Sequence, residues 1–167
     1  MEHKIDRTIE LNPISVEYSR DIFESFDLNV IKYLPIDEPP RKIEDTQAFV
    51  HHSIEQMKLG NDLVWVILFK GKFVGCCGIH GIQSKLPHFG LWIKTDAQGQ
   101  GIGKKVVAYK LDWGISNLNV EYIKYPVDKR NRNSLKLIEG LGLIAGDKYQ
   151  MGNDKKLDVI EYRLHRT

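Results

Sequence analysis

Cysteine is scarce in this chain, which has two cysteines among its 167 residues, and both stand together at Cys76 and Cys77. They fall inside an apparent strand, where neighbouring side chains point to opposite faces. The pair is therefore unsuited to a disulfide or a metal site, and we interpret both as reduced, small core residues. The sequence gives no other indication of a bound metal.

An apolar N-terminal run and a large excess of one charge are also absent. The first ten residues, MEHKIDRTIE, predict neither a signal peptide nor a membrane anchor. Net charge is only +2, from 24 basic and 22 acidic residues, which is too small to indicate a nucleic-acid partner. We expect a cytoplasmic protein with one domain over residues 1–167, as a monomer or homodimer, and no nucleic-acid or membrane partner.

A glycine-rich loop is the most informative stretch that is present. Residues 91–94 (LWIK) are typical of a short strand, and an amphipathic segment starts at Ile102. Between them stand Gly99, Gly101 and Gly103, which permit positive φ and close approach of a ligand to the backbone. Together with the unpaired N–H groups at a helix N-terminus, such a loop predicts an anion site, most naturally for a phosphate or pyrophosphate.

The spacing of this loop separates the classes of phosphate site. A Walker loop fails because Gln98 occupies its first glycine position and Lys104 is followed by Lys105. A dinucleotide-binding fingerprint fails because Lys104 occupies the position of its third glycine. The pattern that fits is Gln-x-x-Gly-x-Gly, and an ordinary glycine-rich turn before a helix is the alternative.

The order of predicted elements indicates an α+β fold. Strands are predicted at 8–11, 63–69, 73–80, 88–94, 121–126, 144–151 and 157–165. Helices are predicted to start near Ser15, at Asp45 or Thr46, at Ile102 and at Asn131. The resulting order is β-α-α-β-β-β-α-β-α-β-β. Segment 29–43 carries three prolines and is either a binding loop or a surface crossover.

These motifs resemble those of the GNAT acetyltransferases, and in particular the Rim-type branch that acetylates ribosomal-protein N-termini. Gln98, Gly101 and Gly103 match motif A, and Asn131 with Ser134 and the following Glu139-Gly140-Leu141-Gly142-Leu143 match a second motif. Two departures are visible, since a basic residue is usual at position 140 and Phe at 143. The resemblance covers residues 8–165 and implies a mixed, mostly antiparallel sheet of six to seven strands with helices on both faces.

The resemblance also implies that residues 8–90 face the acceptor. Residues 91–165 are then expected to bind acetyl-CoA, without a metal. In the first part, the candidate acceptor-side residues are Tyr33, Leu34 and Asp37. In the second part, backbone groups of residues 92–94 are expected to bind pantetheine amides. The full expected cofactor site is Trp92, Ile93, Lys94, Gln98, Gly99, Gln100, Gly101, Ile102, Gly103, Lys104, Asn131 and Ser134.

Transfer of an acetyl group to an amine needs a neutral nucleophile and a stabilised thiolate leaving group. By resemblance, Ser134 is expected to donate to the departing sulfur, although a helix cap is the alternative role. His80 and His88 are the candidate bases, because histidine accepts protons near neutrality. Each is also a strand-end residue of ordinary type, and deprotonation by water would leave no trace in the sequence.

The resulting expectation is an acetyl-CoA-dependent N-acetyltransferase acting on a protein N-terminal α-amine. A small amine, such as an amino acid, polyamine or amino sugar, is the alternative acceptor. A non-catalytic CoA-binding domain and a nucleotide-binding protein are the alternatives of a different class. The missing Walker Ser/Thr weighs against the last of these.

Overall fold

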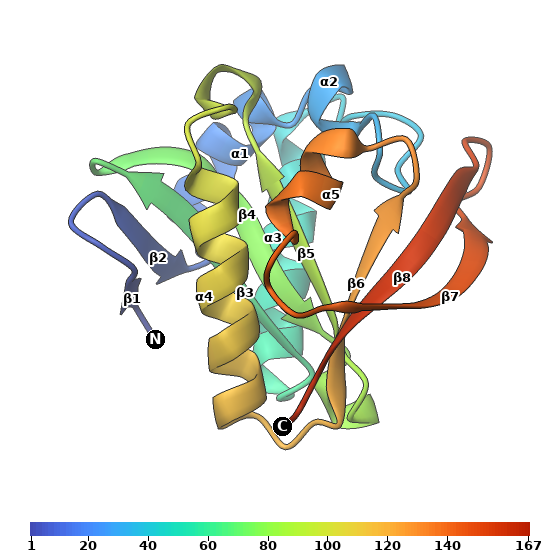
Figure 1. The fold of residues 1–167 in the computed structure, drawn as a ribbon. Coiled ribbons are helices and arrows are strands. Elements are labelled where there is room, and N and C mark those ends of the chain that lie inside the picture. Colours follow the sequence, from blue (N-terminus) through green and yellow to red (C-terminus); the bar gives the residue numbers. More distant parts are fainter.

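The computed structural model describes residues 1–167 and is built on one eight-stranded sheet with the strand order β1-β2-β3-β4-β5-β6-β8-β7 (Figure 1). The strands are β1 His3–Lys4, β2 Ile9–Pro13, β3 Asp62–Phe69, β4 Lys72–His80, β5 His88–Ile93, β6 Tyr122–Asp128, β7 Ile144–Met151 and β8 Leu157–His165. The helices are α1 Ser19–Ser25, α2 Leu28–Ile31, α3 Ile43–Lys58, α4 Ile102–Asn117 and α5 Arg132–Leu137. Short 3₁₀ turns cover Val16–Tyr18, Ile82–Ser84 and Thr95–Ala97. No helix is long and apolar enough to span a bilayer.

The predicted fold class and element order are confirmed, with two additions. The two-residue strand β1 pairs with β2 through His3 and Leu11, which makes the sheet one strand larger than expected. Helix α2 lies inside the proline-containing segment, where Asp27 accepts a hydrogen bond from the N–H of Val30 at 3.0 Å. Both elements are too short to leave a periodic pattern in the sequence.

The geometry of the site depends on one pair of neighbouring strands, β5 and β6. All neighbouring strands are antiparallel except β5 and β6, which are parallel and share a single register pair, His88 with Lys124. Beyond that pair the two strands diverge, and they form the two arms of a V in Figure 1. The edge of β5 above His88 therefore has no strand to pair with.

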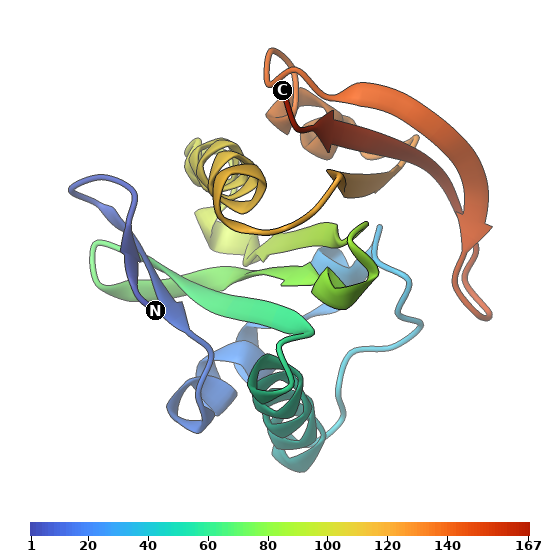
Figure 2. The ribbon, with the colours of Figure 1, turned by 90° about the horizontal axis from the view of Figure 1, so that it is seen from below.

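The sheet separates two hydrophobic clusters. Helix α4 covers one face, and α1 and α3 cover the other, as the view from below shows (Figure 2). Adjacent Cys77 and Cys76 contribute to the two clusters on opposite sides, and both are free and buried, as predicted. Helix α4 is tightly seated on the sheet, because a Cβ at Gly114 would lie 2.6 Å from the Cδ1 of Ile123.

A buried lysine lies between α4 and the N-terminal strands. The Lys110 ammonium is fully buried, 3.4 Å from the ring centre of Trp65 and 3.8 Å from that of Trp113. His3 Nε2 lies 3.5 Å from the same nitrogen, and the indole N–H of Trp65 donates to the carbonyl of Met1 at 3.0 Å. Burial lowers the pKa of Lys110 to about 7, and the indole faces oppose that shift by attracting the ammonium. Met1 is thus held by Trp65 of β3, and His3 lies against Lys110 of α4.

Candidate active site

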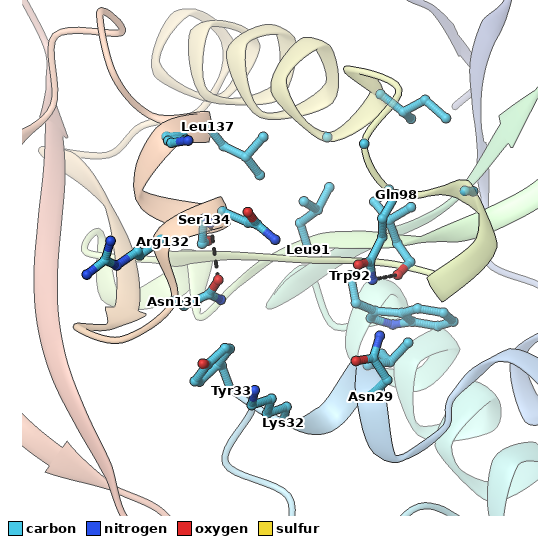
Figure 3. A pocket seen from close by; sticks show the side chains of 18 of the residues that line it. Asn29, Lys32, Tyr33, Leu91, Trp92, Gln98, Asn131, Arg132, Ser134 and Leu137 are labelled. Atoms are coloured by element: carbon cyan, nitrogen blue, oxygen red, sulfur yellow. Dashed lines mark hydrogen bonds between the residues drawn. The ribbon is translucent and has the colours of Figure 1, made fainter.

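A cavity of about 580 Å³ opens where β5 and β6 diverge. Three parts of the chain surround it: the glycine loop with the start of α4, the segment from α2 to residue 34, and the start of α5 (Figure 3). Its lining residues are Asn29, Val30, Lys32, Tyr33, Leu34, Leu91, Trp92, Ile93, Ala97, Gln98, Gly99, Gly101, Ile102, Gly103, Arg130, Asn131, Arg132, Asn133, Ser134, Lys136 and Leu137. The size falls in the range of small-molecule and cofactor sites.

Charge in the lining is of one sign. Four basic side chains contribute to the wall and no Asp or Glu does; the basic residues are Lys32, Arg130, Arg132 and Lys136. A cavity wall with cations and no carboxylates of its own favours an anionic ligand.

The glycine loop has the backbone conformation that its sequence predicts. Gly99 and Gly101 have φ of +79° and +77°, values that other residues rarely adopt, and Gly101 directly precedes the first turn of α4. A Cβ at either position would meet no protein atom within 4 Å, so the space beside the backbone is open. The Gln98 side chain donates to the carbonyl of Ile93 at 2.8 Å and ties the loop to the end of β5. Free N–H groups at the start of α4 therefore face an accessible space suited to a phosphate.

The open edge of β5 offers backbone groups of alternate residues. The Lys94 N–H donates to the carbonyl of Val74 in β4 at 2.8 Å, so the expectation of a free Lys94 N–H is wrong. Because backbone groups alternate in direction along a strand, those of Leu91 and Ile93 point toward the gap instead. Leu91 was missed as a site residue, and the alternation along the strand was the signal that would have identified it.

The start of α5 places Ser134 beside a buried phenol. Asn131 accepts from the Ser134 N–H at 3.2 Å and is itself the N-cap, so Ser134 is not the helix cap. The Ser134 hydroxyl lies 2.9 Å from the hydroxyl of Tyr125 in β6. Burial raises the pKa of Tyr125, and the hydrogen bond between Tyr125 and Ser134 opposes that shift. Tyr125 therefore remains a neutral phenol, able to donate to Ser134 while the serine proton points into the cavity.

Arg130 is fixed at the cavity wall by a buried carboxylate. Asp128 has no exposed side-chain surface and accepts two bonds of 2.9 Å from the Arg130 guanidinium. The same carboxylate accepts from the Asp158 N–H at 3.1 Å. The guanidinium also lies 5.8 Å from the ring centre of Tyr33, which links the two halves of the chain across the cavity.

Several predicted residues lie outside the cavity. Gln100 and Lys104 do not line it, and the neighbouring Lys105 pairs with Asp6 at 2.9 Å. The Asp37 carboxylate accepts from the backbone N–H of Lys155 at 2.8 Å, so it holds the loop between β7 and β8 against the acceptor-side segment. The other two predicted acceptor-side residues line the wall.

The two candidate histidines lie at the base of the V. His80 and His88 stack with ring centres 5.1 Å apart, and His80 Nδ1 lies 3.1 Å from Asp62 Oδ2. Partial burial, the neighbouring His80 and Lys124 together lower the pKa of His88 to about 4. Both rings belong to the face of the sheet that carries α1 and α3, because their neighbours Ile79 and Phe89 point into the cluster under α4.

A second, smaller cavity of about 260 Å³ adjoins the first. Trp92 lines both cavities and separates them with its indole. The other lining residues of the smaller cavity come from α1, the following loop and α3; they are Ile22, Phe26, Ile36, Glu38, Pro40, Asp45, Thr46 and Phe49. Its two carboxylates already have partners, since Glu38 pairs with Arg41 at 2.7 Å and Asp45 accepts from the backbone N–H of Lys42 at 3.3 Å.

Comparisons with known proteins identify the family of the chain. The profile of the acetyltransferase (GNAT) domain family matches residues 8–144, whereas a search of curated protein sequences finds no match. Among solved structures, the ribosomal L7/L12 alpha-N-protein acetyltransferase RimL in complex with coenzyme A superposes with a TM-score of 0.86 at 15% identity, over 99% of this chain and 98% of that one.

Two further structures show the same fold. The microcin C7 self-immunity acetyltransferase MccE in complex with acetyl-CoA and AMP has a TM-score of 0.85 at 19% identity, over 97% and 94% of the two chains. The spermidine N-acetyltransferase of Vibrio cholerae, in complex with CoA and spermine, has a TM-score of 0.81 at 17% identity, over 96% and 97%. The chain belongs to the GNAT acetyltransferase family and is an acetyl-CoA-dependent N-acetyltransferase.

Proposed function

We propose that the chain acetylates the N-terminal α-amine of a protein or peptide, with acetyl-CoA held in the larger cavity. The carboxylate-free wall, to which Arg130 and Arg132 contribute, supports placement of the phosphates in the cavity beside the glycine loop. The open edge at Leu91 and Ile93 supports placement of the pantetheine arm along β5. The thioester then lies toward the base of the V, beyond the Ser134 hydroxyl.

The smaller cavity is the observation that favours a peptide acceptor. Its wall is largely apolar, and Phe49 on its rim is 46% exposed, so it suits the first side chain of a peptide. A polyamine would need unpaired carboxylates, whereas Glu38, Asp45 and Asp37 each have a partner within the chain. A small cationic amine is the second candidate, because Glu38 and Asp45 still line the cavity.

Thiol release from acetyl-CoA, measured across a panel of acceptors, tests this proposal. The panel contains peptides that differ only in the first residue, their N-terminally blocked forms, spermidine, free amino acids and an amino sugar. We expect turnover with unblocked peptides that begin with an apolar residue, and none with blocked ones. Preference for spermidine would select the second candidate, and acetylation of blocked peptides on a lysine would contradict both.

Phe49→Ser serves as the matched test of the smaller cavity. It should raise the KM of the apolar peptide while the Kd of acetyl-CoA, measured by calorimetry, stays unchanged. His52→Ser on the exposed face of the same helix is the control, and it should change neither constant.

A further inference from the structure

The His80 imidazole is held by a carboxylate that is itself fixed. One oxygen of Asp62 lies 3.1 Å from His80 Nδ1, and the other accepts from the Gly81 N–H at 3.0 Å. The Asp62 side chain is 13% exposed, whereas that of His80 is 31% exposed. Because a carboxylate accepts hydrogen bonds, it places the ring proton on Nδ1 and leaves the lone pair on Nε2.

The Nε2 lone pair of His80 lies over a part of the sheet where two glycines pair. Gly78 in β4 pairs with Gly90 in β5, and a Cβ built on Gly78 would lie 2.6 Å from His80 Nε2. A Cβ on Gly90 would meet no atom within 4 Å, so no side chain covers the sheet at Gly90 and the space above it is open. The next pair along the same face is Cys76 with Trp92. On this face of the sheet, the open space over Gly90 therefore lies between the two histidines and Trp92, which lines both cavities.

His88 lies beside His80 on the same face of the sheet and is a poorer base. Its ring stacks on His80 at an interplanar angle of 26°, and its strand partner is Lys124. No carboxylate bonds to it, and its lowered pKa keeps it neutral and weakly basic above about pH 4. The charged groups around His80 are thus Asp62 from β3 and, beyond His88, Lys124 from β6.

We propose that Asp62 and His80 form a dyad in which His80 is the catalytic base and Asp62 its positioning residue. The acceptor ammonium enters over Gly90 and loses one proton to His80 Nε2. The amine lone pair then forms the C–N bond to the thioester carbonyl carbon. The C–S bond breaks, the thiolate takes up a proton, and the second amine proton leaves to solvent. This inference rests on the proposed function, and it assigns the uptake of the acceptor's ammonium proton to His80 Nε2.

Three variants and their pH profiles test the dyad on the best acceptor of the panel. His80→Gln should lower kcat/KM about 100-fold, as expected for loss of a general base. Asp62→Asn should lower it about tenfold and shift the acid limb of the pH profile. The double variant should be no worse than His80→Gln alone, because the carboxylate acts through the imidazole. His51→Gln, at an exposed histidine of α3 outside both cavities, is the matched control, with a change below about threefold.

Two measurements distinguish a role of His80 and Asp62 in catalysis from a purely structural role. Imidazole added to the His80→Gly variant should restore part of the turnover, and Asp62→Glu should restore part of the Asp62→Asn loss. Nitrogen NMR of the wild type should find the His80 proton on Nδ1, and Asp62→Asn should weaken that preference. The dyad would be overturned if Asp62→Asn had the same pH profile as the wild type, or if the His80 proton of the wild type were on Nε2. Acetyl-CoA binding by the wild type, measured by calorimetry, separately tests the proposed function.

Discussion

The hydroxyl groups of Ser134 and Tyr125 lie 2.9 Å apart at the junction of α5 and β6. Because Asn131 caps the helix, the serine hydroxyl has no role in the helix start and its proton is available to a ligand. When the phenol donates to the serine, the serine proton is left to point into the cavity, which is the arrangement needed to stabilise a thiolate leaving group.

Ser134→Ala should therefore lower kcat with little change in acetyl-CoA affinity. The loss of one transition-state donor costs about 3 kcal/mol or less, which is up to about 100-fold in rate. Steady-state kinetics and calorimetry on the purified variant check both parts. Tyr125→Phe should lower kcat less, because the serine then keeps its hydroxyl but loses its orientation. A larger effect of Tyr125→Phe than of Ser134→Ala would mean that the phenol itself is the donor.

Gly101→Ala should weaken acetyl-CoA binding about tenfold or more, because a Cβ would occupy the open space beside the phosphate-binding backbone. Gly71→Ala is the matched control. Gly71 has φ of +79°, almost the same as Gly101, and its surroundings are equally open, but it belongs to the turn between β3 and β4. Both substitutions should cost about 1–2 kcal/mol of stability from the left-handed backbone. Calorimetry should separate them, and equal acetyl-CoA affinities would rule out the loop as the phosphate site.

Lys110→Met should stabilise the protein or leave its stability unchanged, by about 0–4 kcal/mol at pH 6, because an apolar side chain of similar volume replaces a buried ammonium. The folded-state pKa of about 7 lies below the ordinary value of 10.5. The unfolded chain therefore binds more protons between these values, and wild-type stability rises with pH across that window. The advantage of the variant should shrink by a few kcal/mol between pH 7 and pH 9.5. Urea denaturation at both pH values measures it, with exposed Lys104→Met as the control.

Asp128→Asn should destabilise the protein by about 1–3 kcal/mol at pH 7, because it weakens the two bonds to Arg130. The Arg130 guanidinium lowers the pKa of Asp128, so the wild-type advantage is present above the ordinary Asp value of 3.8. That advantage should be lost as pH falls below this value, where the folded carboxylate takes up its proton. Denaturation curves at pH 7 and pH 3 compare the two proteins. Acetyl-CoA affinity should also fall several-fold, since Arg130 loses its anchor at the cavity wall.

The glycine loop was predictable because its signals are local. Positive φ at Gly99 and Gly101, a preceding strand and an amphipathic helix all lie within 30 residues, and each has a sequence signature. The order of strands and helices followed from hydrophobic periodicity in the same way. Ser134 and Asn131 were placed at the cavity by their motif, although which one caps the helix needed the actual backbone.

The partners of charged residues were not predictable, because they come from distant parts of the chain. Lys105 stands next to the glycine loop in sequence, yet its ammonium bonds to Asp6, 99 residues away. Asp37 was expected to face the acceptor, and it instead binds the backbone of Lys155. Lys32 carries no motif, and it lines the cavity only because α2 brings it there. Periodicity defines which face of an element is buried, but it carries no information about pairing between exposed faces.

The loop between β7 and β8 joins parts of the chain that are made at very different times. Lys155 donates through its backbone to Asp37 and through its ammonium to the carbonyl of Ile31, across 118 and 124 residues. Strand β8 is also inserted between β6 and β7, so β7 has no partner, and β6 has none besides β5, until β8 has been synthesised. The wall of the cavity at Tyr33 and Leu34 therefore reaches its final position late in folding. Acetyl-CoA, which needs that wall, stabilises the last step of assembly and gives no help to a nascent chain that lacks β8.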